Sequence, residues 1–234
     1  FQFSGLDNSI PVNIDDIWGE AEDLPFTNPF CFFGNSVDEF QVGSNGLLSF
    51  NPVPTPFFDT TTGTNYGSSG YFATPGIDLI PTNNTASLRD ANVFTPFHDI
   101  DPSVNSQTEI SWEIIGDFPN RVLAVSFFDV AMYEGGNNCP ISATHMAVFY
   151  ETTNIIDIYV QSAPSCNFNN NSKIIGIQNN DGTIAYFPEN RNNTGNWETQ
   201  DEAWRFTPNG DTVTLFEWFE GDQASGLGAD QLIS

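Results

Sequence analysis

The sequence predicts an all-β fold, an antiparallel β-sandwich, from three observations. Short runs of β-branched and aromatic residues recur along the chain, and Gly, Asn, Asp and Pro separate them. Helical periodicity is almost absent, since only residues 14–23 (IDDIWGEAED) could form a helix and Gly19 weakens even that stretch. The chain has 234 residues, of which 39% are hydrophobic and 22 are Phe. It is therefore long and apolar enough to bury a substantial core.

The expected strands fall into two groups. The first covers residues 29–34, 39–43 and 46–50, and SNG at 44–46 is a hairpin-type turn. Residues 51–90, rich in Pro, Gly, Thr and Asn, are predicted to form a long loop. The second group begins at residue 91 and contains two hairpins, in MAVFYETTNIIDIYV and in IIGIQNNDGTIAYF. EAWRF, at residues 202–206, closes this unit, so the sandwich domain is expected to span residues 1–208.

A second unit is expected to begin after residue 208. The run TVTLFEWF alternates apolar and polar residues, and the polar turn GDQASGLG follows it shortly before the chain stops. One strand and a half cannot bury its own apolar face. Residues 209–234 are therefore predicted to be the start of a truncated immunoglobulin-like repeat, and the chain is predicted to be a piece of a longer protein.

The charge of the chain excludes several classes of partner. There are 30 acidic residues against 5 basic ones, which gives a formal net charge of −25. Phosphate binding needs clusters of Lys and Arg, so nucleic acid and anionic membrane surfaces are excluded as partners. No run of 18 or more apolar residues occurs, so we expect no membrane insertion. The excess of carboxylates suits an extracellular surface in contact with divalent cations.

The three cysteines predict one disulfide. Cys139 and Cys166 lie in loop-like sequence at the ends of apolar runs, whereas Cys31 lies inside an aromatic strand. We therefore expect a Cys139–Cys166 bond and a buried, free Cys31; the alternative is three unpaired thiols in a reducing compartment. No CxxC motif and no Cys/His pair at metal-binding spacing occurs, so no zinc site is expected.

The stretch PFHDIDPSV, residues 96–104, combines a histidine with two aspartates. If it forms one strand, Asp99 and Asp101 point to one face and His98 points to the other. This separation argues against an acid–base–nucleophile arrangement. The two carboxylates also stand side by side, whereas glycosidase carboxylates face each other across a cleft. No catalytic residue is therefore predicted, and the chain is not expected to be an enzyme.

Two interpretations of this aspartate pair remain open. Asp99 and Asp101 could bind calcium, with a third ligand from a loop residue such as Asp129 or Asp181, because hard cations prefer several oxygen ligands. Alternatively, Asp101 caps a turn before Pro102 and Asp99 pairs with a buried arginine. The arginines in apolar strands are Arg121 and Arg205. A second acidic segment, residues 14–23, lacks the ligand order of an EF-hand and is predicted to be a solvated edge.

Aromatic residues in polar loops give a carbohydrate-binding hypothesis. Aromatic rings beside Asn and Asp hold sugar rings by stacking and hydrogen bonding in many sandwiches. Alternatively, the long loop folds back and buries these rings. The candidate platform residues are Phe57, Phe58, Tyr66, Tyr71 and Trp197.

Several segments together resemble a known family. FCFFGNSVDEFQVGSNGLLSF, ANVFTPFHDIDPS, NRVLAVSFFDV, AVFYETTNIIDIYV, IIGIQNNDGT and EAWRFTP are similar, in this order, to the nidogen-like domain of large secreted Bacteroidota surface proteins. The resemblance implies export by the type IX secretion system, in proteins of adhesin type that are sometimes linked to gliding. It also implies tandem immunoglobulin-like or PKD-like repeats after EAWRFTP, and it supplies no catalytic residues.

The sequence and this resemblance together predict a non-catalytic extracellular module of a larger surface or secreted protein. We expect it to act in adhesion or in surface or filament assembly. Its expected partners are other domains of the same chain and a protein or polysaccharide surface. The alternative is a carbohydrate-binding module that anchors a partner to polysaccharide.

Overall fold

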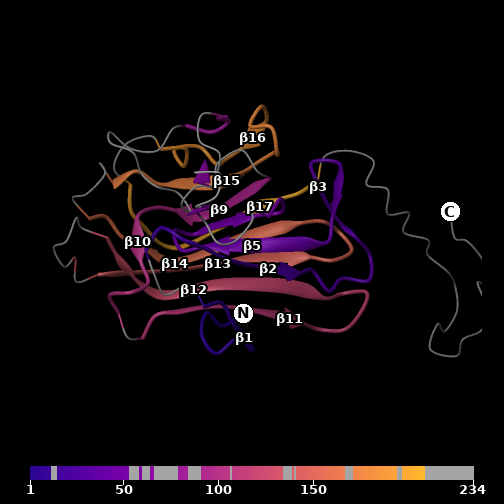
Figure 1. Cartoon of the computed structure of the whole chain (residues 1–234), viewed down its shortest axis with the longest axis horizontal. Coiled ribbons are helices and arrows are strands. Elements are labelled where there is room, and N and C mark those ends of the chain that lie inside the picture. Colours follow the sequence, from indigo (N-terminus) through magenta and orange to yellow (C-terminus); the bar gives the residue numbers. More distant parts are fainter. Residues whose placement is uncertain are drawn as a thin grey trace, which may run out of the picture.

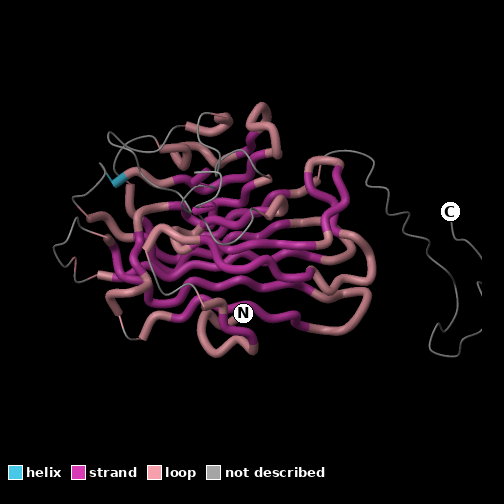
Figure 2. Tube along the Cα trace, in the orientation of Figure 1, coloured by secondary structure: helices cyan, strands magenta, loops and turns pink. Residues whose placement is uncertain are grey.

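A computed structural model shows the all-β fold that the sequence predicts (Figures 1 and 2). The structure describes residues 1–11, 15–52, 58–59, 64–65, 79–83, 91–105, 107–133, 139, 141–166, 171–193 and 197–208. Most of the predicted loop 51–90 and all of residues 209–234 lie outside this description, so the boundary at residue 208 stays a prediction. No helix in the described part of the chain is long and apolar enough to cross a membrane.

Two antiparallel sheets form the body of the molecule. Sheet A has the order β1 (Asn8–Ser9), β11 (Glu109–Ile115), β12 (Val122–Met132), β13 (Ser142–Tyr150), β14 (Ile156–Ala163) and β17 (Thr199–Phe206), and β10 (Ile100–Asp101) also pairs with β12. Sheet B has the order β16 (Ala185–Tyr186), β15 (Ile174–Gln178), β9 (Asn92–Phe97), β6 (Leu47–Ser49), β5 (Glu39–Gly43) and β2 (Trp18–Asp23). Two small hairpins lie outside these sheets: β3 (Phe30–Phe32) with β4 (Asn35–Val37), and β7 (Phe58–Asp59) with β8 (Thr64–Asn65).

The predicted hairpins are confirmed. SNG joins β5 to β6, ETTN lies in the connection between β13 and β14, and the NNDG sequence lies between β15 and β16. EAWRF lies in β17, which pairs with β14 at the end of sheet A. The acidic segment that could have formed a helix instead provides β2, which pairs with β5 at the end of sheet B.

The main core lies between the two sheets. Leu123, Val125 and Phe127 of β12 contribute to it, whereas Val122 and Ala124, which alternate with them, belong to a separate cluster on the other face of sheet A. The alternation follows from the pleat, because successive side chains point to opposite faces. The N-terminal segment contributes to this outer cluster through Leu6 and Phe3.

Sheet B is also buried on both faces. Leu48 and Val93 pack in the main core, while their neighbours Leu47 and Phe94 join a further cluster with Ile80. Burial on both faces explains why the central strands are continuous apolar runs rather than strict alternations.

Gly46 fixes the turn between β5 and β6. Its φ is +76°, and a Cβ atom at this position would lie 2.1 Å from the carbonyl oxygen of Pro96. Glycine is therefore the residue that lets this turn approach the end of β9. This close approach brings Asn45 to the segment that follows β9, where the candidate site lies.

Candidate metal centre

Residues 98–99 cross from one sheet to the other. β9 ends at Phe97 in sheet B, and β10 begins at Ile100 and pairs with β12 in sheet A. The prediction of one continuous strand through PFHDID is therefore wrong, because the chain changes sheets within it. Asn45 holds the crossover: its backbone oxygen accepts a hydrogen bond from the His98 N–H, and its side-chain oxygen accepts one from the Ile100 N–H, both at 3.1 Å.

The crossover brings Asp99 to the acidic segment that precedes β2. Carboxylate oxygens of Asp15, Asp16 and Asp99 all lie within 4.8 Å of one another. Asn45 Nδ2 donates a 2.8 Å hydrogen bond to Asp16 Oδ1, so the residue that positions the crossover also positions this carboxylate. Asp15 Oδ1 is buried and has no hydrogen-bond donor within the described part of the chain. We call these three residues the aspartate cluster.

The aspartate cluster is electrostatically crowded. Burial, and then the negative charges of Asp16 and Asp101, raise the pKa of Asp15 to about 7. Burial and the charge of Asp101 also raise the pKa of Asp16, against the hydrogen bond from Asn45. Burial and the neighbouring carboxylates raise the pKa of Tyr133 as well. Such a group of oxygen ligands matches the preference of calcium for several carboxylate and carbonyl oxygens.

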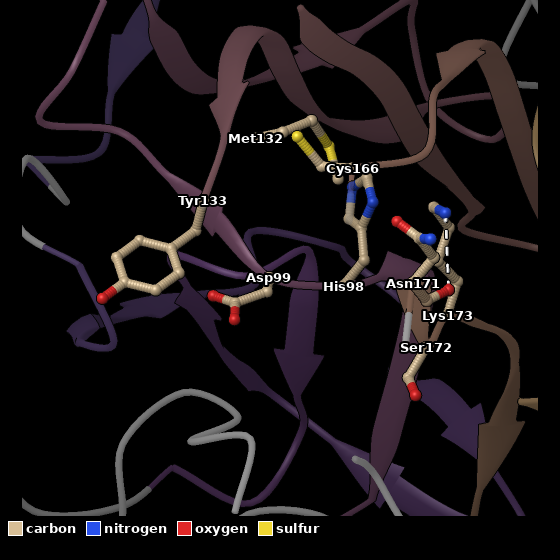
Figure 3. A pocket seen from close by; sticks show the side chains of 8 residues that line it. All are labelled: His98, Asp99, Met132, Tyr133, Cys166, Asn171, Ser172 and Lys173. Atoms are coloured by element: carbon tan, nitrogen blue, oxygen red, sulfur yellow. Dashed lines mark hydrogen bonds between the residues drawn. The ribbon is translucent and has the colours of Figure 1, made fainter. Parts of the chain in front are cut away.

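The two aspartates of PFHDIDPSV have different surroundings. Asp101 Oδ1 accepts hydrogen bonds from the Ser103 N–H at 2.8 Å and from the Ser103 hydroxyl at 2.6 Å, as the turn-capping interpretation predicts. Asp99 belongs to the aspartate cluster, and its carboxylate lies on the Tyr133 side of the crossover in Figure 3. The calcium interpretation of the pair stays a prediction, and the structure adds Asp15 and Asp16 to its candidate ligands.

The third ligands expected from the sequence lie elsewhere. Asp129 Oδ2 accepts a 2.6 Å hydrogen bond from Asn105 Nδ2. Asp181 Oδ1 accepts a 3.2 Å hydrogen bond from the Thr183 N–H in the turn before β16. Neither aspartate belongs to the aspartate cluster. The acidic segment 14–23, expected to be a solvated edge, provides the additional carboxylates instead.

The arginines in apolar strands have anionic partners, as expected, but Asp99 is not one of them. Arg121 pairs with Glu151 at 2.6 Å and Arg205 pairs with Asp157 at 2.7 Å. The predicted pairing of Asp99 with one of these arginines is therefore wrong. Each arginine instead binds a carboxylate on or near the β13–β14 hairpin.

The sugar-platform residues fall mostly outside the described part of the chain. Phe57, Tyr66 and Tyr71 lie outside it, and of Phe58 only the backbone, in β7, is described. The Trp197 ring lies 4.6 Å from the Arg191 guanidinium carbon and 5.4 Å from Lys173 Nζ, measured to the ring centroid. Carbohydrate binding by these aromatics stays a prediction.

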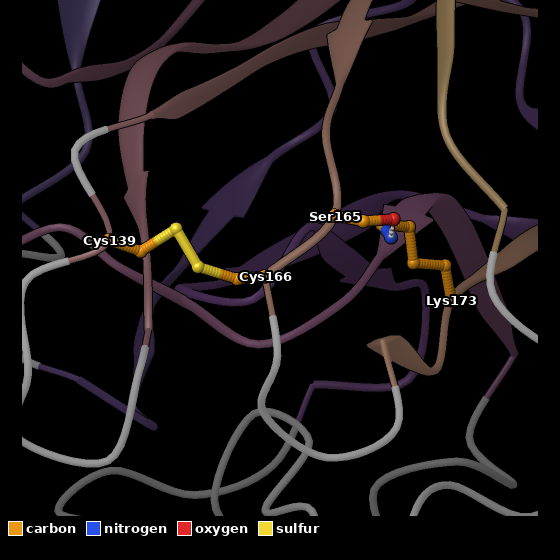
Figure 4. Close-up of a disulfide and its surroundings, with 4 residues drawn as sticks. All are labelled: Cys139, Ser165, Cys166 and Lys173. Atoms are coloured by element: carbon orange, nitrogen blue, oxygen red, sulfur yellow. Dashed lines mark hydrogen bonds between the residues drawn. A yellow bond between two sulfur atoms is a disulfide. The ribbon is translucent and has the colours of Figure 1, made fainter.

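The predicted disulfide is confirmed. Cys139 and Cys166 are bonded, with their Cα atoms 6.5 Å apart (Figure 4). Cys31 is free, as expected, but it is only partly buried. It lies in the short β3–β4 hairpin rather than in either main sheet, which explains why the expectation of full burial is wrong.

Fold, disulfide and acidic surface together define an all-β module suited to an oxidising environment. The chain belongs to the NIDO-related family, whose model matches residues 2–217. This match confirms the nidogen-like resemblance, and it ends beyond the domain boundary expected at residue 208. No curated protein and no solved structure matches the chain.

Proposed function

We propose that this chain is a non-catalytic extracellular module of a larger secreted or cell-surface protein, and that it acts in adhesion or surface assembly. Membership of the NIDO-related family supports a non-catalytic module. The Cys139–Cys166 bond supports an extracellular setting, because disulfides persist in oxidising compartments. The resemblance to Bacteroidota surface proteins supports a more specific proposal, namely that the parent protein leaves the cell by type IX secretion.

We further propose that the module binds calcium, and the aspartate cluster is the observation that carries this proposal. Three carboxylates from two distant segments converge within 4.8 Å, and one of their oxygens is buried without a hydrogen-bond donor in the described part of the chain. Crowded carboxylates repel one another, and a divalent cation converts that repulsion into attraction. Calcium would then join the segment before β2 to the crossover between the sheets.

Thermal unfolding tests the calcium site. In a chelator the melting temperature is expected to fall, and added calcium should restore it. A ligand at about 100 times its Kd stabilises by about 2.7 kcal/mol, and each kcal/mol moves the melting temperature of a chain of this size by about 2–4 °C. Asp99→Asn should remove most of the response, whereas the exposed control Asp38→Asn should keep it. Equal melting temperatures with and without calcium would refute the site.

Adhesion needs a separate test, because a calcium-free module could still adhere. Beads coated with the chain are expected to attach to protein-coated or polysaccharide-coated glass, and beads coated with heat-unfolded chain should not. Attachment to agarose or cellulose alone, blocked by the free sugar, would favour the carbohydrate-binding alternative. Turnover of chromogenic glycosides or esters that co-purifies with the folded chain would contradict a non-catalytic role.

A further inference from the structure

A small cavity lies beside the crossover, and His98 and Asp99 of the crossover both line it. It has a volume of about 10 Å³, close to the room that one water molecule needs. The His98 ring lies on the side of Asn171 and Lys173, away from the Asp99 carboxylate (Figure 3). The lining residues that matter for the argument are His98, Asp99, Asn171 and Lys173.

The hydrogen-bond contacts of two buried histidines allow their tautomers to be assigned. Thr95 Oγ1 lies 3.0 Å from both the Gly46 carbonyl oxygen and His145 Nδ1; with the hydroxyl proton assigned to the carbonyl, the hydroxyl oxygen accepts from His145 Nδ1. His145 therefore carries its proton on Nδ1 and offers a lone pair at Nε2. The Nε2 atom of His98 lies 3.3 Å from that lone pair and must donate to it.

This assignment requires both rings to be neutral, and their surroundings favour the neutral form. Burial lowers the pKa of His145 to about 3. His98 is likewise buried, and burial disfavours a charged imidazole. A neutral His98 that carries its proton on Nε2 has an unprotonated Nδ1. That atom is an acceptor of hydrogen bonds and not a donor.

Two buried acceptors consequently line the same cavity. His98 Nδ1 and Asn171 Oδ1 are both buried, and neither has a hydrogen-bond partner in the described part of the chain. Figure 3 shows the oxygen of the Asn171 amide on the side that faces the His98 ring. An unsatisfied buried acceptor is destabilising, so a molecule that donates to both atoms would be stabilising.

The charge of Lys173 narrows the class of ligand. Its side chain is fully buried, and Nζ donates to Ser165 Oγ at 3.2 Å, to the Trp197 carbonyl at 3.0 Å and to the Asn171 carbonyl at 3.5 Å. These three acceptors use all three ammonium protons. The positive charge disfavours a metal ion in the adjoining cavity, and the two lone pairs disfavour an anion. A small neutral molecule with two donors remains.

We propose that the cavity binds one water molecule, which donates its two protons to His98 Nδ1 and Asn171 Oδ1. The water extends a chain of hydrogen bonds that runs through His98, His145 and Thr95 to the Gly46 carbonyl. It thereby connects the segment before β15 to the crossover and to the β5–β6 turn. The two proposed acceptors, His98 Nδ1 and Asn171 Oδ1, are not among the candidate calcium ligands, although Asp99 lines the cavity and also belongs to the aspartate cluster.

A high-resolution crystal structure and ¹⁵N NMR of the imidazoles test the proposal together. A spherical, non-anomalous density peak within hydrogen-bonding distance of both acceptors is expected. His98 should carry its proton on Nε2, and His145 should carry its proton on Nδ1. An anomalous peak, which would indicate a metal, would overturn the proposal. So would an Asn171 amide that donates directly to His98 with no density between the two.

A glycine substitution gives the matched solution test. Asn171 has a φ of 52°, a conformation that glycine adopts readily, so Asn171→Gly removes the acceptor with little backbone strain. The exposed Asn190, with a φ of 60°, provides the control Asn190→Gly. The wild type and the control should show cross-relaxation between a long-lived water and the His98 ring, and Asn171→Gly should lose it. Persistence of the signal in Asn171→Gly, or its absence from the wild type, would contradict the proposed water.

Discussion

Two regions of this molecule contain buried carboxylates, and their surroundings shift the pKa values of these carboxylates in opposite directions. Near the β13–β14 turn, the fully buried Glu151 accepts hydrogen bonds from the Thr27 and Asn28 amides and from Arg121. Burial alone would raise the pKa of Glu151, but Arg121 and the two amides outweigh it and hold the pKa below its ordinary value. In the aspartate cluster, burial and mutual repulsion prevail, and the pKa values of Asp15 and Asp16 rise.

The difference follows from how the few cations of the chain are distributed. Only 5 basic residues accompany 30 acidic ones. Arg121, Arg191 and Arg205 each form an ion pair with one carboxylate, and Lys173 binds neutral oxygens. Asp15 and Asp16 form no ion pair with a described lysine or arginine. A protein of this composition stabilises some buried carboxylates internally, and we infer that it leaves others to a cation from the medium.

Removing Glu151 should have the largest effect on stability. Glu151→Ala would leave Arg121 and two backbone amides without their acceptor, and breaking a buried ion pair costs about 3–5 kcal/mol. Urea denaturation measures the loss, with the exposed Glu39→Ala as the control. A loss as small as that of the control would show that water replaces the carboxylate, and the contrast between the two regions would disappear.

Asp15→Asn should change the stability of the protein in opposite directions without and with calcium. Without calcium, Asp15→Asn removes a repelling charge and should raise the melting temperature. With calcium it removes a ligand and should remove much of the roughly 2.7 kcal/mol expected near 100 times the Kd. Calorimetry in chelator and in calcium measures both. The same sign in both states would contradict a metal site that relieves repulsion.

The aspartate cluster also predicts a pH dependence of the metal-free protein. The pKa of Asp15 is about 7 in the folded state and about 3.9 in an unfolded chain, so the folded state binds more protons between these values. The stabilising contribution of protonated Asp15 is fully present below pH 4 and is lost as the pH rises through about 7. The free energy of unfolding of the wild type minus that of Asp15→Asn should therefore fall from pH 5 to pH 8. A flat difference would mean that Asp15 titrates normally.

Asp101→Ala should have the smallest effect. It removes the two hydrogen bonds to Ser103 and should cost about 1 kcal/mol. Because Asp101 lies outside the aspartate cluster, the calcium-dependent shift in melting temperature should persist in this variant. Loss of that shift would make Asp101 a ligand, as the sequence alone suggests.

The sequence predicts the local features of the fold well and the candidate site only in part. SNG, ETTN and NNDG specify their turns through a few neighbouring residues, so their hairpins are predictable. The Cys139–Cys166 bond is likewise predictable, because both cysteines end neighbouring apolar runs. The acidic segment 14–23 and PFHDIDPSV are each recognisable as carboxylate-rich. Nothing in either segment indicates that they meet.

Their meeting depends on contacts between distant parts of the chain. β2 pairs with β5, and the β5–β6 turn then presents Asn45 to both Asp16 and the crossover. The crossover itself arises because β9 leaves sheet B after Phe97, and strand alternation cannot predict a change of sheet. The tautomers of His98 and His145 depend in turn on Thr95 and Gly46, and no spacing pattern relates these residues.

The order of sheet A determines how the module would carry tension. β1 and β17, the first and last described strands, are its two ends in the order β1-β11-β12-β13-β14-β17. A pull applied at these two strands would pass in series through the five pairings between them, across the hydrogen bonds of one sheet. Sheet B would lie beside this path, joined to it by the crossover and the other connections. A force that peels β1 or β17 from sheet A could therefore leave sheet B folded.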